Sequence, residues 1–189
     1  ERGAAGDRVA HLPAETLPPP PPVDYFNTLG GVSKDGREYI TVLEGTATTP
    51  APWSNVVANP SFGFLGSGDH SGFTWALNSQ QNQITAWSND PVANEPVEVF
   101  YIRDLDTGEV WTPTAAPIRS RSSRYTIRHG QGYTTYEHQS HGIAAELTQF
   151  VPLVDPLKIS RLKLVNKSPR ARRLAITSYV EWTLGASRA

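Results

Sequence analysis

The chain has 189 residues, a formal net charge of −1, and neither cysteine nor methionine. Its length suits a single domain, and the missing cysteine excludes disulfides, thiolate metal sites and cysteine nucleophiles. The near-zero charge gives no general attraction to nucleic acid or anionic lipid, and no apolar run approaches the roughly 18 residues of a membrane helix, so we expect no nucleic acid partner and no membrane contact by this segment.

Residues 1–22 differ in composition from the rest of the chain and end in five consecutive prolines, Pro18 to Pro22. Such a run favours polyproline II and cannot enter a helix or the interior of a sheet. We predict a disordered Pro-rich linker over 1–22 and one domain over 23–189, with a ligand for a proline-binding module as the alternative for the linker. Because position 1 is not methionine, we interpret the chain as a fragment of a longer protein.

The domain is predicted to consist of short strands. Residues 97–103 are β-branched and aromatic, and residues 142–151 alternate between apolar and polar side chains. Segments 123–129 and 132–138 flank the turn sequence Gly130-Gln131-Gly132, which predicts a hairpin. No window of 11 residues has a helical period, and Gly and Pro recur at short intervals. The fold class predicted is therefore all-β, a large antiparallel two-sheet β-sandwich.

Two segments near the C-terminus carry more specific expectations. Residues 173–184 predict one continuous strand with a single buried face. Its members are Leu174, Ile176, Val180 and Trp182. Residues 156–166 change parity between Leu157/Ile159 and Leu162/Leu164. A β-bulge near Ser160-Arg161 would reconcile the two phases.

Two motifs resemble catalytic or metal sites. Residues 68–72 (Gly-Asp-His-Ser-Gly) lack the spacing of a nucleophile loop, so we favour a flexible turn. His138 and His141 are three residues apart, with His129 upstream, but that spacing brings side chains together only on a helix. Here they flank the end of a predicted strand, a poor geometry for a metal. We predict turn and sheet-surface histidines and no metal site.

Charged clusters occur in two predicted turns. Arg170, Arg172 and Arg173 could bind phosphate or an acidic partner, but a solvated loop is the favoured interpretation. Asp104 and Asp106 occupy another predicted hairpin turn, where aspartate is common because its side chain caps the backbone. Glycosidic chemistry needs an acid and often a second carboxylate at a defined separation. No pair in this sequence can be given that role.

The stretch 72–91 interleaves two tryptophans, Trp75 and Trp87, with neutral amides and a carboxylate. Sugars offer apolar C–H faces, which meet aromatic rings, and hydroxyls, which meet amides or carboxylates. The composition is therefore compatible with a sugar site. The alternative, favoured on composition alone, is that both tryptophans are core residues and the amides satisfy a long loop.

A series of short blocks carries a family resemblance. The main blocks are Phe26-Asn27-Thr28-Leu29-Gly30-Gly31, Asp35-Gly36-Arg37-Glu38-Tyr39, Thr49-Pro50-Ala51-Pro52-Trp53-Ser54-Asn55-Val56, Gly72-Phe73-Thr74-Trp75, Trp87-Ser88-Asn89-Asp90-Pro91 and Arg128-His129-Gly130-Gln131-Gly132-Tyr133. In this order they resemble the N-terminal β-sandwich domain of glycoside hydrolase family 94, formerly glycosyltransferase family 36. The form at 87–91 is more similar to bacterial cyclic β-1,2-glucan synthases than to cellobiose or chitobiose phosphorylases. The resemblance runs from about residue 24 to residue 184, and departs from the family at 68–71, where a more Gly/Ser/Ala-rich turn is expected.

The resemblance implies a large two-sheet sandwich, often called a supersandwich and similar to galactose mutarotase. In the family a helical linker and an α/α barrel follow, and the barrel carries the general acid. We expect the sandwich to end near 182–185, close to the last residue of this sequence, so that the barrel and its phosphate pocket lie outside it. No residue here then inherits a catalytic role, and the chain alone is expected to be inactive. The resemblance implies no cofactor, with inorganic phosphate a substrate of the parent enzyme.

The resemblance also implies substrate contacts in the sandwich loops. The expected sugar-binding residues are Trp75, Asn78, Trp87, Asn89 and Asp90, with Arg128 and His129 as a second group. Expected partners are a β-glucan oligosaccharide, the parent's α/α barrel and a second copy in a homodimer. The parent would act at the cytoplasmic face of a bacterial inner membrane.

Three functions remain open at this point. The first is an accessory sandwich domain of a β-glucan-processing enzyme, whose parent carries out inverting phosphorolysis or glycosyl transfer. The second is a free-standing carbohydrate-binding module. The third is a structural dimerisation domain whose aromatic residues all belong to the core. The family resemblance favours the first.

Overall fold

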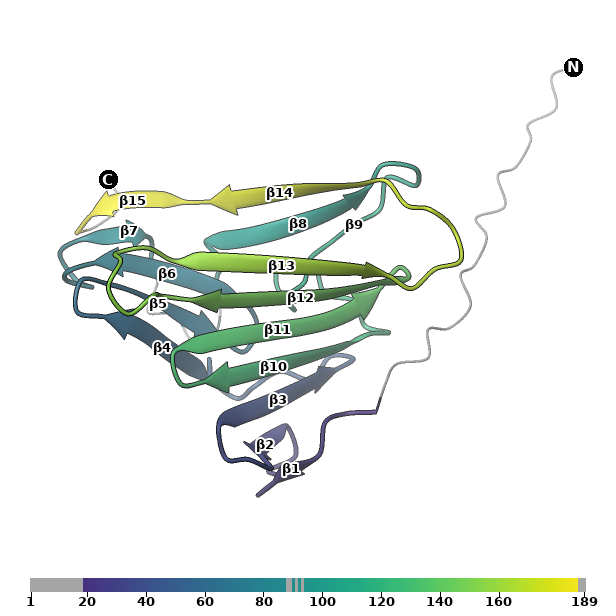
Figure 1. The fold of residues 1–189 in the computed structure, drawn as a ribbon, viewed down its shortest axis with the longest axis horizontal. Helices are drawn as coiled ribbons and strands as arrows, with labels where there is room; N and C mark the ends of the chain where they lie inside the picture. The colour runs from purple at the N-terminus through teal and green to yellow at the C-terminus, as the bar shows by residue number, and fades with distance from the viewer. Residues whose placement is uncertain (1–18, 88–89, 91, 93, 187–189) are drawn as a thin grey trace, which may run out of the picture.

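The computed structural model describes residues 19–87, 90, 92 and 94–186. These residues form 15 strands, every strand pairing among them is antiparallel, and none of them lies in a helix, as the predicted all-β class requires. Nothing in this described part could therefore cross a bilayer as an apolar helix. Figure 1 shows the strands arranged in two layers.

One layer is a seven-stranded sheet with the order β1-β2-β3-β10-β11-β12-β13 (Figure 1). Its strands are β1 (Val23–Asp24), β2 (Gly30–Ser33), β3 (Glu38–Glu44), β10 (Arg124–Gly130), β11 (Tyr133–Ser140), β12 (Ile143–Phe150) and β13 (Ile159–Asn166). The predicted hairpin is present as β10 and β11, with its turn at residues 131–132. The predicted alternation is present in β12, where Ile143, Ala145 and Leu147 are buried.

The second layer contains a five-stranded sheet, β15-β7-β6-β5-β4, and a three-stranded sheet, β14-β8-β9. The first is built from β4 (Ser54–Asn59), β5 (Phe62–Ser67), β6 (Ser71–Ala76), β7 (Gln83–Thr85) and β15 (Trp182–Gly185). The second is built from β8 (Glu98–Asp104), β9 (Val110–Trp111) and β14 (Leu174–Val180). The predicted strand at 97–103 corresponds to β8.

The core lies between the seven-stranded sheet and the second layer. One cluster joins Leu43, Tyr125, Ile127, Tyr136 and Leu147, with Phe100 of β8 packed against it. A second joins Ile143 and Ala145 of β12 to Ile102 and Trp111 of the three-stranded sheet. Alternate residues of β8, β10 and β12 thus supply the core, the arrangement expected of a sandwich.

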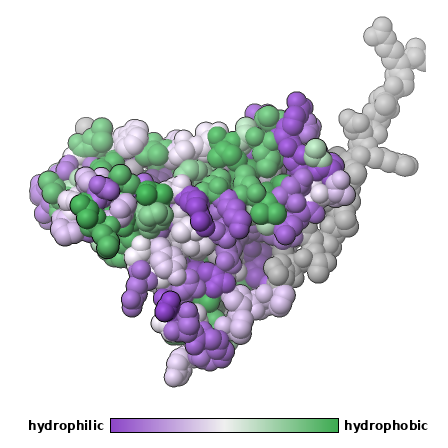
Figure 2. Space-filling view, in the orientation of Figure 1, coloured by the Kyte–Doolittle hydropathy of each residue, from purple (hydrophilic) through white to green (hydrophobic). Residues whose placement is uncertain are grey.

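The segment 173–184 is not one strand with one buried face, so that prediction is wrong. The chain leaves the three-stranded sheet after Val180 and enters the five-stranded sheet at Trp182, where β15 pairs with β7. Glu181 lies at the crossing, and its N–H donates to the Val97 carbonyl at 2.9 Å. Both are edge strands of their sheets, and the side chains of Ile176 and Trp182 on them are exposed. Figure 2 shows apolar surface on this side of the molecule.

The predicted bulge near Ser160-Arg161 is also absent. Strand β13 starts at Ile159 and pairs with β12 in unbroken register to Asn166. Leu162 and Leu164 pack against the core, whereas Ile159 is partly exposed beside Phe150, its partner in the register. The change of parity arises because apolar residues occur on both faces of this strand.

A buried ion pair connects β8 to the segment that precedes β13. Lys158 Nζ lies 2.5 Å from Glu98 Oε2 and 2.9 Å from Ser71 Oγ, and 4.5 Å from the Phe64 ring centre. The other Glu98 oxygen accepts hydrogen bonds from Thr74 and Thr85. Burial would raise the pKa of Glu98, but the Lys158 charge and these hydrogen bonds outweigh burial and lower it. The carboxylate is therefore held ionised inside the sandwich.

His138 belongs to the core, not to the sheet surface as predicted. Its ring stacks on Tyr125 with centres 4.0 Å apart, and Nδ1 donates to the Arg124 carbonyl at 3.2 Å. Nε2 is buried and makes no hydrogen bond with the described residues. Burial therefore lowers the pKa of His138 to about 4, from an ordinary value of 6.5.

This burial predicts acid sensitivity. His138 stays neutral in the folded protein, whereas in the unfolded chain it is protonated below its ordinary pKa of 6.5. Above pH 6.5 the residue therefore does not lower the free energy of unfolding, and as pH falls from 6.5 toward 4 that free energy decreases by about 3 kcal/mol. The loss due to His138 is the difference between the unsubstituted protein and His138→Phe in urea unfolding between pH 7 and pH 4.5, because His129, whose pKa is also lowered to about 4, adds its own loss. In His138→Phe, which keeps an aromatic ring on Tyr125, the pH dependence in this window should be weaker. An unchanged dependence would contradict the assignment to His138.

Candidate functional site

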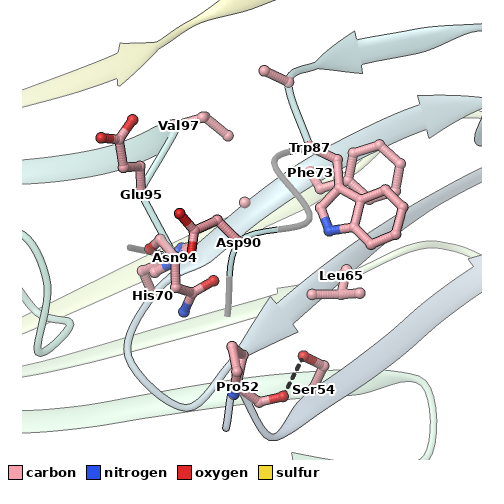
Figure 3. A pocket seen from close by; sticks show the side chains of 12 residues that line it. Pro52, Ser54, Leu65, His70, Phe73, Trp87, Asp90, Asn94, Glu95 and Val97 are labelled. Carbon is pink, nitrogen blue, oxygen red and sulfur yellow. Dashed lines mark hydrogen bonds between the residues drawn. The ribbon is translucent and has the colours of Figure 1, made fainter. Parts of the chain in front are cut away.

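A cavity of about 210 Å³ opens beside the five-stranded sheet, between the β5–β6 turn and the segment that leads from β7 to β8 (Figure 3). Its volume is below the roughly 300–1,000 Å³ of pockets for drug-sized ligands, so it suits one small unit of a ligand. The lining residues are Pro52, Ser54, Leu65, His70, Gly72, Phe73, Ala86, Trp87, Asp90, Asn94, Glu95 and Val97.

An aromatic stack forms one wall of the cavity. Trp87 is 53% exposed and stacks on Phe73 with ring centres 5.5 Å apart and an interplanar angle of 29°. Phe73 is buried and packs in turn against Trp75, at 5.0 Å between ring centres. Trp87 is therefore supported from behind while much of its ring remains accessible.

A β-bulge places Phe73 in this stack. The pairing of β5 with β6 shifts so that Phe64 faces Thr74 and Leu65 faces Gly72, which leaves Phe73 as the extra residue. Phe73 has φ 61°, in the left-handed region that non-glycine residues rarely adopt. Bulges commonly redirect a side chain beside a functional site. Here the bulge allows Phe73 to support Trp87.

Polar groups occupy the other wall. His70 Nε2 lies 2.7 Å from the Asn94 carbonyl, so Nε2 carries the proton, because a carbonyl only accepts. Nδ1 is then an acceptor, and it is buried without a partner among the described residues. The Asp90 carboxylate accepts a hydrogen bond from the Val92 N–H at 2.9 Å. A carboxylate, an amide and an imidazole thus converge opposite the indole (Figure 3).

The seven-stranded sheet holds the β5–β6 turn in place. The buried Tyr136 hydroxyl lies 3.0 Å from the Ser67 carbonyl and 2.9 Å from the His70 carbonyl. Burial raises the pKa of Tyr136, so the hydroxyl stays protonated and donates. Only residues 68–70 of the motif form a turn, because Ser71 and Gly72 already belong to β6, and the turn is held in place rather than flexible as predicted. Ser71 Oγ accepts a hydrogen bond from Lys158.

The structure brings together only some of the predicted sugar-binding residues. Trp87 and Asp90 line the cavity. Trp75 lies behind Phe73 and is not among the lining residues, and Asn78 caps a turn, its Oδ1 accepting from two backbone N–H groups at 2.9 Å each. Asn89 lies outside the described residues.

The second predicted pair, Arg128 and His129, is divided between the two faces of β10. Arg128 forms ion pairs with Glu38 at 3.0 Å and Glu137 at 2.8 Å. His129 Nδ1 lies 3.2 Å from Thr134 Oγ1, and burial lowers the pKa of His129 to about 4. Neither residue lines the cavity, and the structure does not bring the pair together.

Sequence reasoning missed several lining residues. Phe73 lies inside the block Gly72-Phe73-Thr74-Trp75, but nothing in the sequence marked the bulge that redirects it. His70 lies in the segment where the sequence departs from the family pattern, and that departure was the available signal. Asn94 and Glu95 follow the segment 72–91 directly, and only the fold brings them to the cavity.

The carboxyl groups that the structure perturbs most clearly are not suited to act as acids. Hydrogen bonds from Ser33 and the Arg37 N–H lower the pKa of Asp35. Glu98 and Asp104 also have lowered pKa values, despite the opposing effect of burial. A general acid in glycosidic chemistry needs a raised pKa. These three groups stay ionised at neutral pH, which suits structural roles.

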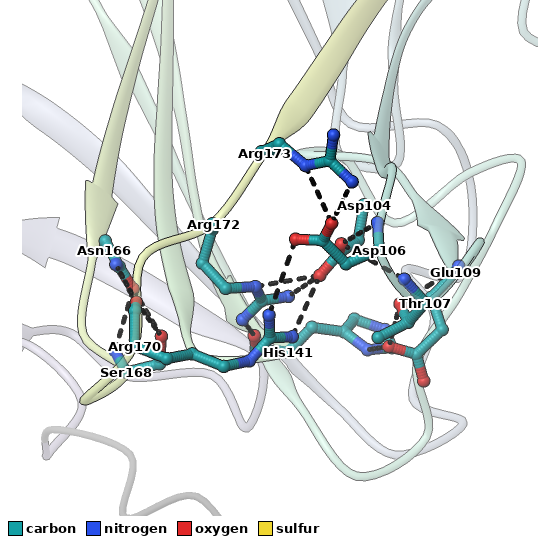
Figure 4. Close-up of polar contacts among 10 residues, drawn as sticks. All are labelled: Asp104, Asp106, Thr107, Glu109, His141, Asn166, Ser168, Arg170, Arg172 and Arg173. Carbon is teal, nitrogen blue, oxygen red and sulfur yellow. Dashed lines mark hydrogen bonds and ion pairs between the residues drawn. The ribbon is translucent and has the colours of Figure 1, made fainter.

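The predicted arginine and aspartate clusters bind each other (Figure 4). Arg172 Nε donates to Asp104 Oδ2 at 2.8 Å, and both side chains are almost completely buried. Arg170 reaches Asp104 at 3.3 Å and Asp106 at 3.7 Å, and Arg173 Nε donates to Asp106 at 2.8 Å. The loop after β13 is thereby fastened to the β8–β9 turn.

Asp104 also caps its own turn. Its Oδ1 accepts from the Asp106 N–H at 2.8 Å and from the Thr107 N–H at 3.3 Å. Burial would raise the pKa of Asp104, but these hydrogen bonds and Arg172 lower it to about 2. The predicted capping role is confirmed. The predicted solvated arginine loop is wrong for Arg172, because its charge is neutralised inside the protein.

Comparison with known proteins identifies the family. Residues 37–189 match the model of the glycosyl hydrolase 94 supersandwich domain. The chain is 40% identical over 166 residues to a cyclic β-(1,2)-glucan synthase of Rhizobium meliloti, covering 88% of this chain and 6% of that protein. It is 35% identical over 159 residues to a solabiose phosphorylase of Paenibacillus borealis, covering 82% of this chain and 20% of that protein.

A third relative is an N,N'-diacetylchitobiose phosphorylase of Vibrio proteolyticus, 28% identical over 82% of this chain and 19% of that protein. The higher identity to the glucan synthase agrees with the resemblance read at residues 87–91. The chain spans only 6–20% of the length of these three relatives. With four fifths of the sequence matched and the antiparallel sandwich in place, the chain belongs to the glycosyl hydrolase 94 supersandwich family.

Proposed function

We propose that this chain is the accessory supersandwich domain of a β-glucan-processing enzyme, and that the cavity beside Trp87 binds one sugar unit of the glucan. The half-exposed Trp87, supported by Phe73 and facing Asp90 and His70 across a small cavity, carries the proposal. A sugar ring stacks its C–H face on an indole, and its hydroxyls then reach carboxylate, amide or imidazole groups.

Catalysis is assigned to another part of the parent enzyme. Its reaction would be inverting phosphorolysis or glycosyl transfer on a β-glucan, with inorganic phosphate as a substrate of the phosphorolysis. The relatives, a cyclic β-(1,2)-glucan synthase and a solabiose phosphorylase, support this class of reaction. The catalytic barrel and a second copy are the proposed partners, at the cytoplasmic face of the bacterial inner membrane. The role of the sandwich is to hold substrate for that chemistry.

Trp87→Ala is expected to weaken glucan binding at least tenfold, which corresponds to about 1.4 kcal/mol, because it removes the exposed surface on which the sugar stacks. The measurement is an NMR or calorimetric titration of the protein with linear β-1,2-gluco-oligosaccharide. Trp182→Ala is a matched control, because Trp182 is 59% exposed but lies on β15, away from the cavity lining.

Two outcomes would contradict the proposal. One is the lack of saturable binding by the unsubstituted protein at millimolar oligosaccharide. The other is an equal loss of affinity in Trp87→Ala and Trp182→Ala, because both changes would then act through the fold. A change in self-association of Trp87→Ala without any sugar binding would favour a dimerisation domain.

A further inference from the structure

Two adjacent aromatic side chains project from the loop between β1 and β2. Tyr25 is 89% exposed and Phe26 is 63% exposed, although each ring would gain free energy by burial. Phe26 begins the first block of the family resemblance and Tyr25 directly precedes that block, and neither residue belongs to the cavity lining or to the core clusters. Exposed large rings side by side on one loop indicate a contact surface.

The loop is held in one conformation. Asn27 Oδ1 accepts from the Leu29 and Gly30 N–H groups at 3.3 and 3.0 Å, and the Asn27 N–H donates to the Gly30 carbonyl at 2.9 Å. A Cβ on Gly30 would lie only 2.3 Å from the Ile40 carbonyl, so no other residue fits there. The aromatic rings are therefore presented by a preorganised loop, which lowers the entropy cost of binding.

The backbone of this loop is strained at two positions. Tyr25 has φ 53° and Thr28 has φ 85°, both in the region that favours glycine. Such conformations persist where the surrounding structure imposes them, and they cluster at binding and catalytic sites. The positive φ of Tyr25 turns the chain out of the extended path of β1 directly before Phe26.

A chain of contacts leads from this loop to the cavity. Asn27 Nδ2 donates to the Tyr39 hydroxyl at 2.9 Å. The Tyr39 ring meets the Trp53 ring edge-on, with centres 5.8 Å apart. The two residues that flank Trp53 in sequence, Pro52 and Ser54, line the cavity. Tyr39 and Trp53 thus connect the exposed loop to the site beside Trp87.

We propose that Tyr25 and Phe26 form a second sugar-stacking platform, so that one glucan chain extends from the cavity across Trp53 to this loop. The inference rests on the proposed function of the cavity. A neutral polymer fits this surface, because Asp24, which directly precedes Tyr25 in the chain, is paired with Lys34 and so does not serve to attract an ionic partner. The aromatic rings arranged from the cavity to this loop would then stack on successive sugar units of the chain.

The test compares β-1,2-gluco-oligosaccharides of about three and about ten or more units, titrated into the same protein by calorimetry. The longer sugar should bind about tenfold more tightly per site, equivalent to about 1.4 kcal/mol. Tyr25→Gly and Phe26→Ala should each weaken binding of the longer sugar several-fold without changing the affinity for the short sugar. Tyr25→Gly should not lower the thermal midpoint, because glycine adopts φ 53° without strain.

A control variant is Leu105→Ala, which removes an exposed apolar side chain from the β8–β9 turn and should leave both affinities unchanged. Equal affinities for short and long sugars would overturn the second platform and leave the cavity proposal standing. Failure of both sugars to bind would overturn the cavity proposal and the platform with it. If Phe26→Ala alters self-association but not sugar affinity, the loop is a protein contact and the platform is refuted.

Discussion

Lys158→Met is expected to lower the free energy of unfolding by about 3–5 kcal/mol. The substitution leaves Glu98 buried and charged, with only the hydroxyls of Thr74 and Thr85 to stabilise it. The Glu98 pKa should then rise, because burial acts without the opposing ammonium. Urea unfolding at pH 7 measures the loss. The variant should become more stable as pH falls through the new, raised pKa, whereas the unsubstituted protein should lose the contribution of the pair only below the ordinary Glu98 value of 4.5.

The matched variant is the double substitution Lys158→Met, Glu98→Gln. Removing both charges commonly costs less than removing one, because no uncompensated charge remains in the interior. The double variant should therefore be more stable than Lys158→Met alone. If the single substitution costs less than about 1 kcal/mol, Glu98 is not held ionised by Lys158, and the network described for the sandwich interior is wrong.

Arg172→Leu is the second substitution with a large expected effect, about 3 kcal/mol of unfolding free energy. Arg172 is 3% exposed and is closer than Arg170 to the fully buried Asp104 carboxylate. Because the pKa of Asp104 is lowered to about 2, the pair contributes its full stability above the ordinary value of 3.8 and loses it as pH falls toward 2. The difference between variant and unsubstituted protein should shrink over that range.

Arg173→Leu provides the comparison. Arg173 also pairs with a carboxylate, Asp106, but its side chain is 73% exposed. Exposed pairs contribute about 0–1 kcal/mol, so this variant should unfold close to the unsubstituted protein. Similar losses in the two variants would show that burial of Arg172 does not determine its role in fastening the β13–β14 loop.

Local patterns allowed much of the sheet structure to be predicted. The alternation in β12 and the Gly-Gln-Gly turn between β10 and β11 are properties of adjacent residues, and both were confirmed. The exchange of sheets between β14 and β15 depends on β8 and β7, which are distant in sequence. The pattern of apolar residues at 173–184 carries no information about which sheet each residue joins.

In the candidate site, too, some residues could be predicted from local sequence and others depend on the fold. Trp87 and Asp90 could be selected because their side-chain chemistry is evident from residue type. Trp75 has the same chemistry, but packs behind Phe73 and close to Gly63, where only a glycine leaves room for the indole. His70 and Asn94 both line the cavity and are joined by a hydrogen bond, although they are 24 residues apart in the sequence. No local sequence pattern predicts such a contact.

The crossing at Glu181 has a consequence for how the second layer assembles. Strands β14 and β15 are separated by one residue, yet each completes a different sheet. Once β14 has paired with β8, β15 is already near β7, so its pairing carries almost no further loop-closure entropy. Cleavage of the backbone at Glu181 would restore that entropic cost, because β15 would no longer be tethered to β14. The two smaller sheets should therefore form and open together as one cooperative unit, although no strand ladder among the described residues joins them.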